Sequence, residues 1–347
     1  MDRREYIFGS VATGVVGFSG ASSAASAPEI GAPIDWQGFV PVGGIDQWVA
    51  TRGLARARMA MLFLHGGPGE AQSPFLSVFT PWEERYVVAQ WDQRGSGRTF
   101  DKGGLSTPNM TLDQHARDAI EVTEIVLRRL GISKLILVGH SWGSIVGLKA
   151  VRSRPELFHA FVGTGQVVSG RETVEGWRTS AIARAREAND ARAAAELSGL
   201  TTPDLMDLAK LGIVFRWQTP FVDADRSYLG VQRGALSGTS GATAGMTSAD
   251  YYRAKLFCVG QLMPFVLGYD ARTDGLDLPV PFFVIQGRDD NRTVPDAARV
   301  FVDQARAPAK NYTAIEGGHF ACFTNPSGFL DALDSDLRQA GIQSARR

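Results

Sequence analysis

Residues Gly139 to Gly143 read Gly-His-Ser-Trp-Gly and lie between two apolar runs. The first run ends at His140 and has the continuous apolarity of a buried strand, while the second has helical spacing. A serine on a sharp turn from strand to helix projects its hydroxyl above the edge of a sheet. The N-terminus of the following helix favours negative charge that develops nearby. The stretch therefore predicts that Ser141 is a nucleophile rather than part of an ordinary turn.

A serine hydroxyl needs a general base, and the base needs an acid that orients it. In a sheet with this kind of turn, the expected chain order is Ser, then Asp or Glu, then His. Asp289 and Asp290 follow a later apolar run, and His319 follows the last one. We prefer Asp290 because it completes a Gly-x-x-D spacing from the strand end at Gly287. The predicted triad is Ser141, Asp290 and His319.

A second glycine-rich turn, His-Gly-Gly-Pro-Gly from 65 to 69, ends an early apolar run. Attack on an acyl carbon creates an oxyanion, which needs two backbone N–H donors. One donor should be Trp142, the residue after the nucleophile, and the other Gly67 in this turn. Pro68 has no N–H to donate, but its ring stiffens the turn. We therefore predict an oxyanion hole formed by Gly67 and Trp142.

A third polar loop, Trp-Asp-Gln-Arg-Gly-Ser-Gly-Arg-Thr from 91 to 99, follows another apolar run. We expect Asp92 and Arg94 to pair and to support the neighbouring glycine turn. The two cysteines, Cys258 and Cys322, allow one disulfide, but no CxxC pattern points to a metal site. Cys322 lies near His319 in the sequence, which leaves a role for its thiol open. A small residue packed in the core explains this cysteine equally well.

Six apolar runs end in glycine or polar residues, where an open α/β sheet places its ligands. Their continuous apolarity is typical of parallel strands covered on both faces. Helical patterns alternate with them, including one that starts with a Thr111–Gln114 capping box and stops at Gly131. This alternation predicts an α/β fold, namely a mostly parallel doubly wound sheet of the α/β-hydrolase type. The six runs are 58–65, 85–92, 133–140, 160–166, 280–287 and 311–318. Two further helices of the core are predicted at 142–152 and 325–341.

The strand pattern is interrupted between 167 and 275 by segments rich in helix formers. We interpret 167–275 as a helical cap inserted between two parts of one core, 28–166 and 276–347. Residues 1–27 carry paired arginines before a weakly apolar, small-residue segment. This pattern predicts a twin-arginine-type export signal and a periplasmic location, with a cytoplasmic location as the alternative.

The composition excludes some partners. Lys plus Arg and Asp plus Glu balance at 36 each, so the formal net charge is zero. A neutral chain has no electrostatic reason to bind nucleic acid or acidic membranes. No segment is apolar and long enough for stable membrane insertion. A hydrophobic content of 44% is enough for a sizeable core.

The motifs at 65–69, 91–98 and 139–144 together resemble those of the prolyl iminopeptidase family of α/β-hydrolases. The resemblance implies a serine hydrolase that needs no metal or cofactor and releases N-terminal residues, often proline, from small peptides. Such an enzyme holds a free α-ammonium group with cap carboxylates, for which Glu172 and Glu175 are the candidates, although a solvated helix face also explains them. His140 departs from the family, which typically has glycine just before the serine of this turn. A histidine at this position matches many esterases instead.

Two alternatives remain open from the sequence. The same triad would serve an esterase, a lactonase or an amidase that acts on small molecules. A protein of another class, an inactive hydrolase fold used for binding, is disfavoured by the complete set of Ser, Asp and His. Five cap aromatics either line an apolar pocket or pack the cap helices; they are Trp177, Phe215, Trp217, Phe221 and Tyr252.

Overall fold

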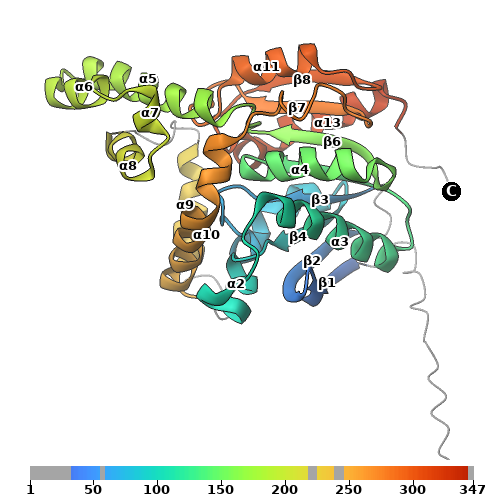
Figure 1. Cartoon of the computed structure of the whole chain (residues 1–347). Helices are drawn as coiled ribbons and strands as arrows, with labels where there is room; N and C mark the ends of the chain where they lie inside the picture. The colour runs from blue at the N-terminus through green and yellow to red at the C-terminus, as the bar shows by residue number, and fades with distance from the viewer. Residues whose placement is uncertain (1–32, 55–58, 218–224, 238–245, 343–347) are drawn as a thin grey trace, which may run out of the picture.

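One eight-stranded sheet forms the centre of the computed structural model, which describes residues 33–54, 59–217, 225–237 and 246–342. The sheet order is β1-β2-β4-β3-β5-β6-β7-β8 (Figure 1). Strands β3 to β8 run parallel, whereas β1 pairs antiparallel with β2 and β2 with β4. The strands are β1 (Pro33–Val42), β2 (Ile45–Leu54), β3 (Ala60–Leu64), β4 (Val87–Asp92), β5 (Leu135–His140), β6 (Phe158–Thr164), β7 (Phe282–Gly287) and β8 (Lys310–Ile315).

The mostly parallel α/β architecture predicted from the sequence is confirmed, and each of β3 to β8 overlaps one of the six apolar runs. Strands β1 and β2 were not predicted. Along β1 the exposure alternates, with its outer face open to solvent. An edge hairpin of this kind lacks the continuous apolarity that marks the central strands.

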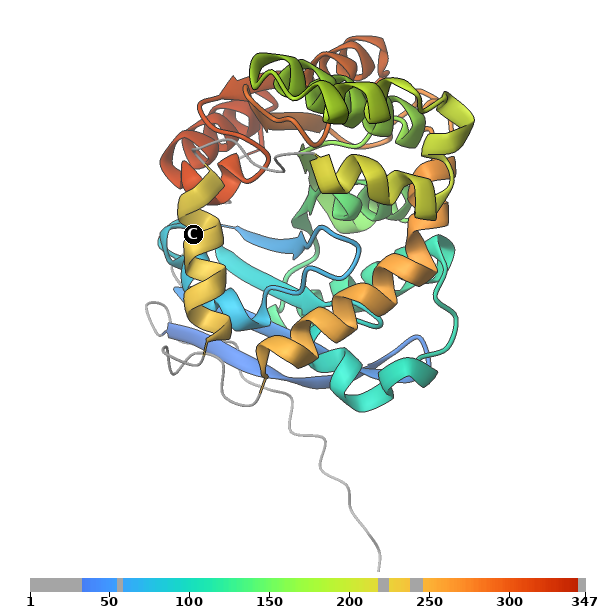
Figure 2. The ribbon, with the colours of Figure 1, turned by 90° about the vertical axis from the view of Figure 1, so that its left-hand side faces the viewer.

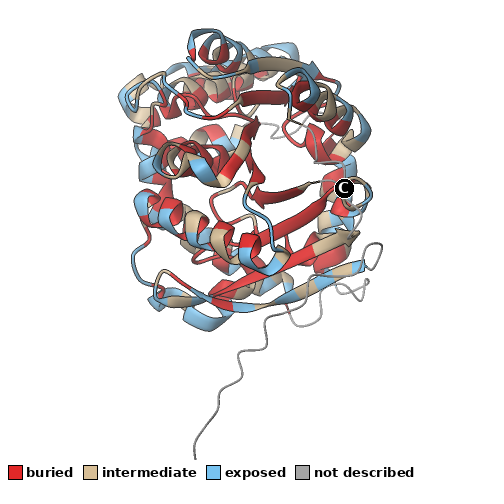
Figure 3. Cartoon of the chain, turned by 90° about the vertical axis from the view of Figure 1, so that its right-hand side faces the viewer, coloured by how far each residue is buried: buried red, intermediate tan, exposed pale blue. Residues whose placement is uncertain are grey.

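Helices cover both faces of the sheet because successive side chains of each central strand point in opposite directions. In β3, Leu62 and Leu64 belong to one buried cluster, and Met61 and Phe63 belong to another. The first cluster includes side chains of α3 (Leu112–Leu130), α4 (Trp142–Ser153) and α11 (Pro295–Gln304). The second includes side chains of α1 (Thr80–Glu83), α12 (Ala321–Thr324) and α13 (Pro326–Gln339). Strands are therefore buried along most of their length, while outer helix faces are exposed (Figure 3).

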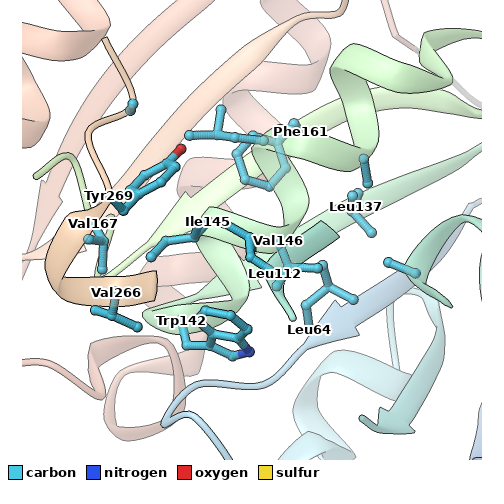
Figure 4. Close-up of a cluster of buried hydrophobic side chains, with 14 of the residues drawn as sticks. Leu64, Leu112, Leu137, Trp142, Ile145, Val146, Phe161, Val167, Val266 and Tyr269 are labelled. Carbon is cyan, nitrogen blue, oxygen red and sulfur yellow. The ribbon is translucent and has the colours of Figure 1, made fainter. Parts of the chain in front are cut away.

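Helix α4 is anchored in the first cluster. Ile145 and Val146 lie among Leu64 and Leu137 of the strands (Figure 4). All four side chains are fully buried. This packing fixes the start of α4 relative to the ends of β3 and β5.

Helix α3 begins and ends close to where its sequence predicts. Thr111 accepts a hydrogen bond from the backbone N–H of Gln114, and Gly131 closes the helix with a left-handed φ of 65°. The Gln114 side chain, however, donates to Asp118 at 2.7 Å. The expected capping box is thus only half formed, because a buried carboxylate binds the glutamine amide.

Six helices between β6 and β7 form the cap within the described part of the chain. They are α5 (Gly170–Glu187), α6 (Ala191–Ser198), α7 (Thr202–Leu205), α8 (Leu208–Trp217), α9 (Arg226–Leu236) and α10 (Ser248–Gly268). Helices α5 to α8 lie together at one end of the molecule (Figure 1), and α9 and α10 lie in front of the sheet when viewed from that side (Figure 2). Four short elements complete the described chain: η1 (Ser73–Phe79), α2 (Gly97–Gly103), η2 (Gly104–Ser106) and η3 (Pro155–Leu157).

The export signal predicted at 1–27 lies outside the described ranges. Within the described residues, no helix combines the length and the apolarity needed to span a bilayer.

A buried ion pair connects the polar loop after β4 to helix α3. Arg94 donates to both carboxylate oxygens of Asp118 at 2.8 and 3.1 Å, and both side chains are fully buried. Arg94 also donates to the backbone oxygens of Gly43 and Pro108. The expected Asp92–Arg94 pair is therefore wrong: the carboxylate of Asp92 accepts from elsewhere, because Asp118 lies within bidentate reach of the guanidinium.

We predict that Asp118→Ala lowers the free energy of unfolding by about 3–5 kcal/mol, because it leaves the Arg94 charge buried without its partner. Urea unfolding monitored by fluorescence would measure the change. As a control, Asp277→Ala removes the partner of Arg306 at an exposed site and should change stability little. Equal effects of the two substitutions would contradict a special role for the buried pair.

Candidate active site

Ser141 lies on a strained turn between β5 and α4. Its φ and ψ are 54° and −118°, a combination that costs a non-glycine residue free energy. A Cβ at Gly139 would lie 2.5 Å from the Gly143 oxygen, and one at Gly143 would collide with the Leu64 carbonyl. Only glycine fits at both positions. The turn leaves Ser141 partly exposed, whereas His140 and Trp142 beside it are buried.

His319 follows β8 and contacts Asp290, which follows β7. The Nδ1 atom of His319 lies 3.1 and 3.0 Å from the two carboxylate oxygens of Asp290. Asp290 also accepts hydrogen bonds from the Arg292 N–H and from the N–H and hydroxyl of Thr293. Asp289, the alternative from the sequence, is exposed. If Nδ1 donates to the carboxylate, the other ring nitrogen, Nε2, is left to act as a base.

The pKa of Asp290 lies below its ordinary value. Burial on its own raises this pKa, but the positive form of His319, the hydrogen bond from its ring and those from Thr293 outweigh burial. The carboxylate is therefore ionised at neutral pH, as a group that stabilises an imidazolium must be.

His140 contacts the backbone of His319 rather than a reacting group. Its Nε2 lies 3.0 Å from the carbonyl oxygen of His319. Since a carbonyl only accepts, this nitrogen carries the proton. Burial, followed by the nearby His319, lowers the pKa of His140 to about 3, so its ring is neutral at physiological pH. The ring centres of the two histidines are 4.7 Å apart.

The glycine turn at 65–69 packs directly on the serine turn. A Cβ at Gly66 would lie 3.0 Å from the Cβ of Ser141, so only glycine allows this approach. Gly67 has a φ of 113° and precedes a cis peptide bond to Pro68. Trp142 is the first residue of α4, and the first N–H groups of a helix have no partner within it. The geometry therefore brings both predicted oxyanion donors, Gly67 and Trp142, to turns beside Ser141.

An ion pair joins this glycine turn to cap helix α10. Lys255 lies 2.6 Å from Glu70, which follows the turn directly. Burial on its own raises the pKa of Glu70, but the charge and hydrogen bond of Lys255, and then Arg292, lower it to about 2. A Cβ at Gly69 would lie 2.7 Å from the Cβ of Cys258, so α10 also packs closely on the turn.

Asp225 is a cap residue that the sequence did not single out. Its two carboxylate oxygens accept the backbone N–H groups of His319 and Phe320, each at 3.0 Å. The carboxylate is buried just before α9. No motif surrounds it, and the contact spans 94 positions of the chain. An aspartate at the start of a helix is typical of a helix cap, so only tertiary structure reveals this partner.

The two cap glutamates predicted to hold an α-ammonium group already have cationic partners. Glu172 pairs with Arg272 at 2.7 Å, and Glu175 pairs with Arg178 at 2.9 Å. The structure therefore does not bring them together as a pair of free carboxylates.

The cap aromatics mostly pack against other residues. Trp177 and Phe215 lie with ring centres 5.2 Å apart, and the Trp177 indole donates to the Arg292 carbonyl. Trp217 donates to Glu196 at 2.7 Å. Tyr252 is exposed and contacts Tyr251 edge-on. Phe221 lies outside the described residues.

The two cysteines are free thiols buried at separate sites, so they form no disulfide. Burial raises the pKa of both thiols, which disfavours the reactive thiolate. Among the residues that the structure describes, no cluster of His, Cys, Asp or Glu side chains has the arrangement to hold a metal ion.

Comparison with known proteins identifies the family. Residues 60–326 match the family described as the alpha/beta hydrolase fold. The chain therefore belongs to the α/β-hydrolase family and is a hydrolase.

Two relatives and one solved structure narrow this assignment. The chain is 29% identical over 307 residues to "Probable aminopeptidase YbaC" of Bacillus subtilis (strain 168), covering 86% of this chain and 94% of that protein. It is 34% identical over 140 residues to a "Probable proline iminopeptidase" of Streptomyces coelicolor, or 40% of this chain and 42% of that one. The crystal structure of proline iminopeptidase from Mycobacterium smegmatis superposes with a TM-score of 0.57 at 17% identity, covering 88% and 98% of the two chains, and shows the shared fold. The protein lies in the prolyl iminopeptidase-like branch of the family.

Buried histidines with lowered pKa values, among them His65 and His140, predict that stability falls with acidification. Burial lowers the pKa of His65 to about 4 and that of His140 to about 3. In the unfolded chain a histidine takes up its proton near pH 6.5. The unfolded state thus binds more protons between about pH 6.5 and 4, and the free energy of unfolding decreases as the pH falls, by at most about 1.4 kcal/mol per pH unit for each histidine.

Urea unfolding across this pH range would measure the slope. His140→Gly introduces the residue that the resembled family typically has at this position, and it should make the slope shallower. An unchanged slope in this variant would show that His140 does not titrate on unfolding.

Proposed function

We propose that the protein is a serine hydrolase with Ser141, His319 and Asp290 as its triad. The contact that carries this proposal is the hydrogen bond of the His319 ring to the buried carboxylate of Asp290. Ser141 lies on a turn that packs against the same histidine through the neighbouring His140. The strained φ of Ser141 further supports the proposal, because strain of this kind accumulates at catalytic turns.

In this mechanism, the Ser141 hydroxyl attacks the acyl carbon while Nε2 of His319 takes its proton. Asp290 holds the ring and stabilises the imidazolium, and the N–H groups of Gly67 and Trp142 stabilise the oxyanion. His319 then protonates the leaving group, which leaves an acyl group on the serine. Water activated by His319 releases the acid and restores the hydroxyl.

We propose release of N-terminal residues from small peptides as the reaction. Similarity to "Probable aminopeptidase YbaC" over 94% of that protein, and the three motifs shared with prolyl iminopeptidases, support this reaction. Hydrolysis of a proline naphthylamide should exceed hydrolysis of the N-acetylated compound, because acetylation removes the α-ammonium group. Equal rates on both compounds would argue against an aminopeptidase.

A second candidate is the hydrolysis of small esters, lactones or amides by the same triad. The observation that favours it is the pairing of both cap glutamates with arginines, which leaves neither free for an ammonium group. Activity on nitrophenyl esters together with inactivity on every N-terminal amide would select this reaction.

We predict that Ser141→Ala lowers kcat at least 10³-fold, because removing a triad nucleophile leaves only the oxyanion donors and binding. Labelling by a fluorophosphonate probe should disappear in the same variant. The matched control is Ser153→Ala at the exposed end of α4, which should keep both labelling and activity. A wild-type protein that folds but is neither labelled nor active on any acyl substrate would instead be an inactive hydrolase fold.

We further predict that Lys255→Met lowers kcat on the order of tenfold, less than the loss of a whole oxyanion donor. The unpaired carboxylate of Glu70 would then lie beside the Gly67 turn and oppose the developing negative charge. Glu70→Gln in the same protein should restore most of the activity, which steady-state kinetics of the single and double variants would measure. A double variant as impaired as Lys255→Met would show that the pair acts only as a tether.

A further inference from the structure

The turn that carries His319 is bound from the cap by a buried carboxylate. Both oxygens of Asp225 accept backbone N–H groups of this turn at 3.0 Å. A buried carboxylate is costly unless hydrogen bonds replace its water. Two N–H donors in adjacent residues supply that replacement, so the carboxylate and the turn stabilise each other's position.

A second contact joins the start of α9 to the chain that follows His319. Tyr228 lies one turn further along α9, and its ring stacks on Phe323 with centres 4.8 Å apart and planes 12° apart. The same ring lies 4.6 Å from that of Phe320. Helix α9 therefore sits on the histidine turn through a polar and an aromatic contact, which together fix its orientation.

The main chain of His319 is thus held on both sides. The cap carboxylate of Asp225 accepts its N–H, and the ring of His140 at the end of β5 donates to its carbonyl oxygen. The side chain meanwhile is held by Asp290. A residue fixed at N–H, carbonyl and ring has little freedom to leave a productive geometry.

We propose that Asp225 is a positioning residue of the catalytic centre, which fixes the main chain of His319 and adds a second carboxylate beside its imidazole. The cap in this way contributes to the chemistry as well as to the substrate pocket. The inference rests on the proposed role of His319 as general base.

Because charged groups surround His319, the inference predicts a change in the pH dependence of kcat/KM. The titratable and charged groups that face His319 and Asp225 are Asp290, Arg292, His140 and Cys322. Burial raises the pKa of Asp225, and bonds from Phe320 and the charge of His319 offset part of this rise. An ionised Asp225 stabilises the protonated imidazole. A neutral side chain there would remove that stabilisation and shift the acidic limb of the kcat/KM profile to lower pH.

The test compares Asp225→Asn with wild type on a substrate that wild type hydrolyses. The amide keeps the shape of the side chain but offers only one acceptor to the two N–H groups. We expect kcat to fall at least tenfold, KM to change less than twofold, and the acidic limb of kcat/KM to move to lower pH. Asp190→Asn, which alters an aspartate of the cap whose side chain caps α6, should change none of these quantities.

Other outcomes would overturn the proposal. A rise in KM with unchanged kcat would make Asp225 a substrate contact. A lower kcat with an unmoved acidic limb would reduce its role to cap stability, and no effect would remove the role altogether. If Asp225→Asn does not fold, Asp225→Ser, which keeps one small acceptor, takes its place with the same criteria. A wild type without activity and without fluorophosphonate labelling would instead reject the proposed function.

Discussion

The sharp turn at Ser141 is the constraint on which the rest of the site depends. A serine at φ 54° stores strain of about 1–3 kcal/mol, which persists only if surrounding contacts over-determine it. Glycine at 139 and 143 lets the turn close against its own helix and against β3. Burial of Ile145 and Val146 then holds that helix in place.

The same need for close approach explains two further glycines. Gly66 brings the oxyanion turn against Ser141, and Gly165 leaves room for the His319 ring, since a Cβ there would lie 2.8 Å from its Cε1. Main-chain segments from four strand ends therefore meet at distances that side chains would forbid. Burial around this meeting point excludes water, which keeps His140 neutral and strengthens the interaction between His319 and Asp290.

Much of this arrangement could be predicted from the sequence, for identifiable reasons. Strands β3 to β7 are buried on both faces for nearly all of their length, and the residues at the strand ends follow a known chain order. The edge strand β1 alternates instead, so it resembles an ordinary exposed segment. The sequence suggested that Arg94 pairs with Asp92, because the two residues are close in the chain. Closeness in sequence does not create a bidentate contact, and the true partner, Asp118, lies on another element. Asp225 was missed because nothing near position 225 indicates a contact with position 319.

The cap contacts both the oxyanion turn and the histidine turn of the proposed active site. A cap that only shaped a pocket would make neither contact. Lys255 of α10 pairs with Glu70 beside the oxyanion turn, whereas Asp225 before α9 binds the histidine turn. Both contacts are ionic or charge-assisted. Asp225 is buried and the Lys255–Glu70 pair is partly buried, so their loss costs more than that of fully exposed pairs. A change in the cap that shifts α9 or α10 would therefore alter the charge balance at the reacting groups as well as the shape of the substrate pocket. In the proposed mechanism, Glu70 and Asp225, two carboxylates outside the core motifs, therefore couple the cap to the catalytic geometry.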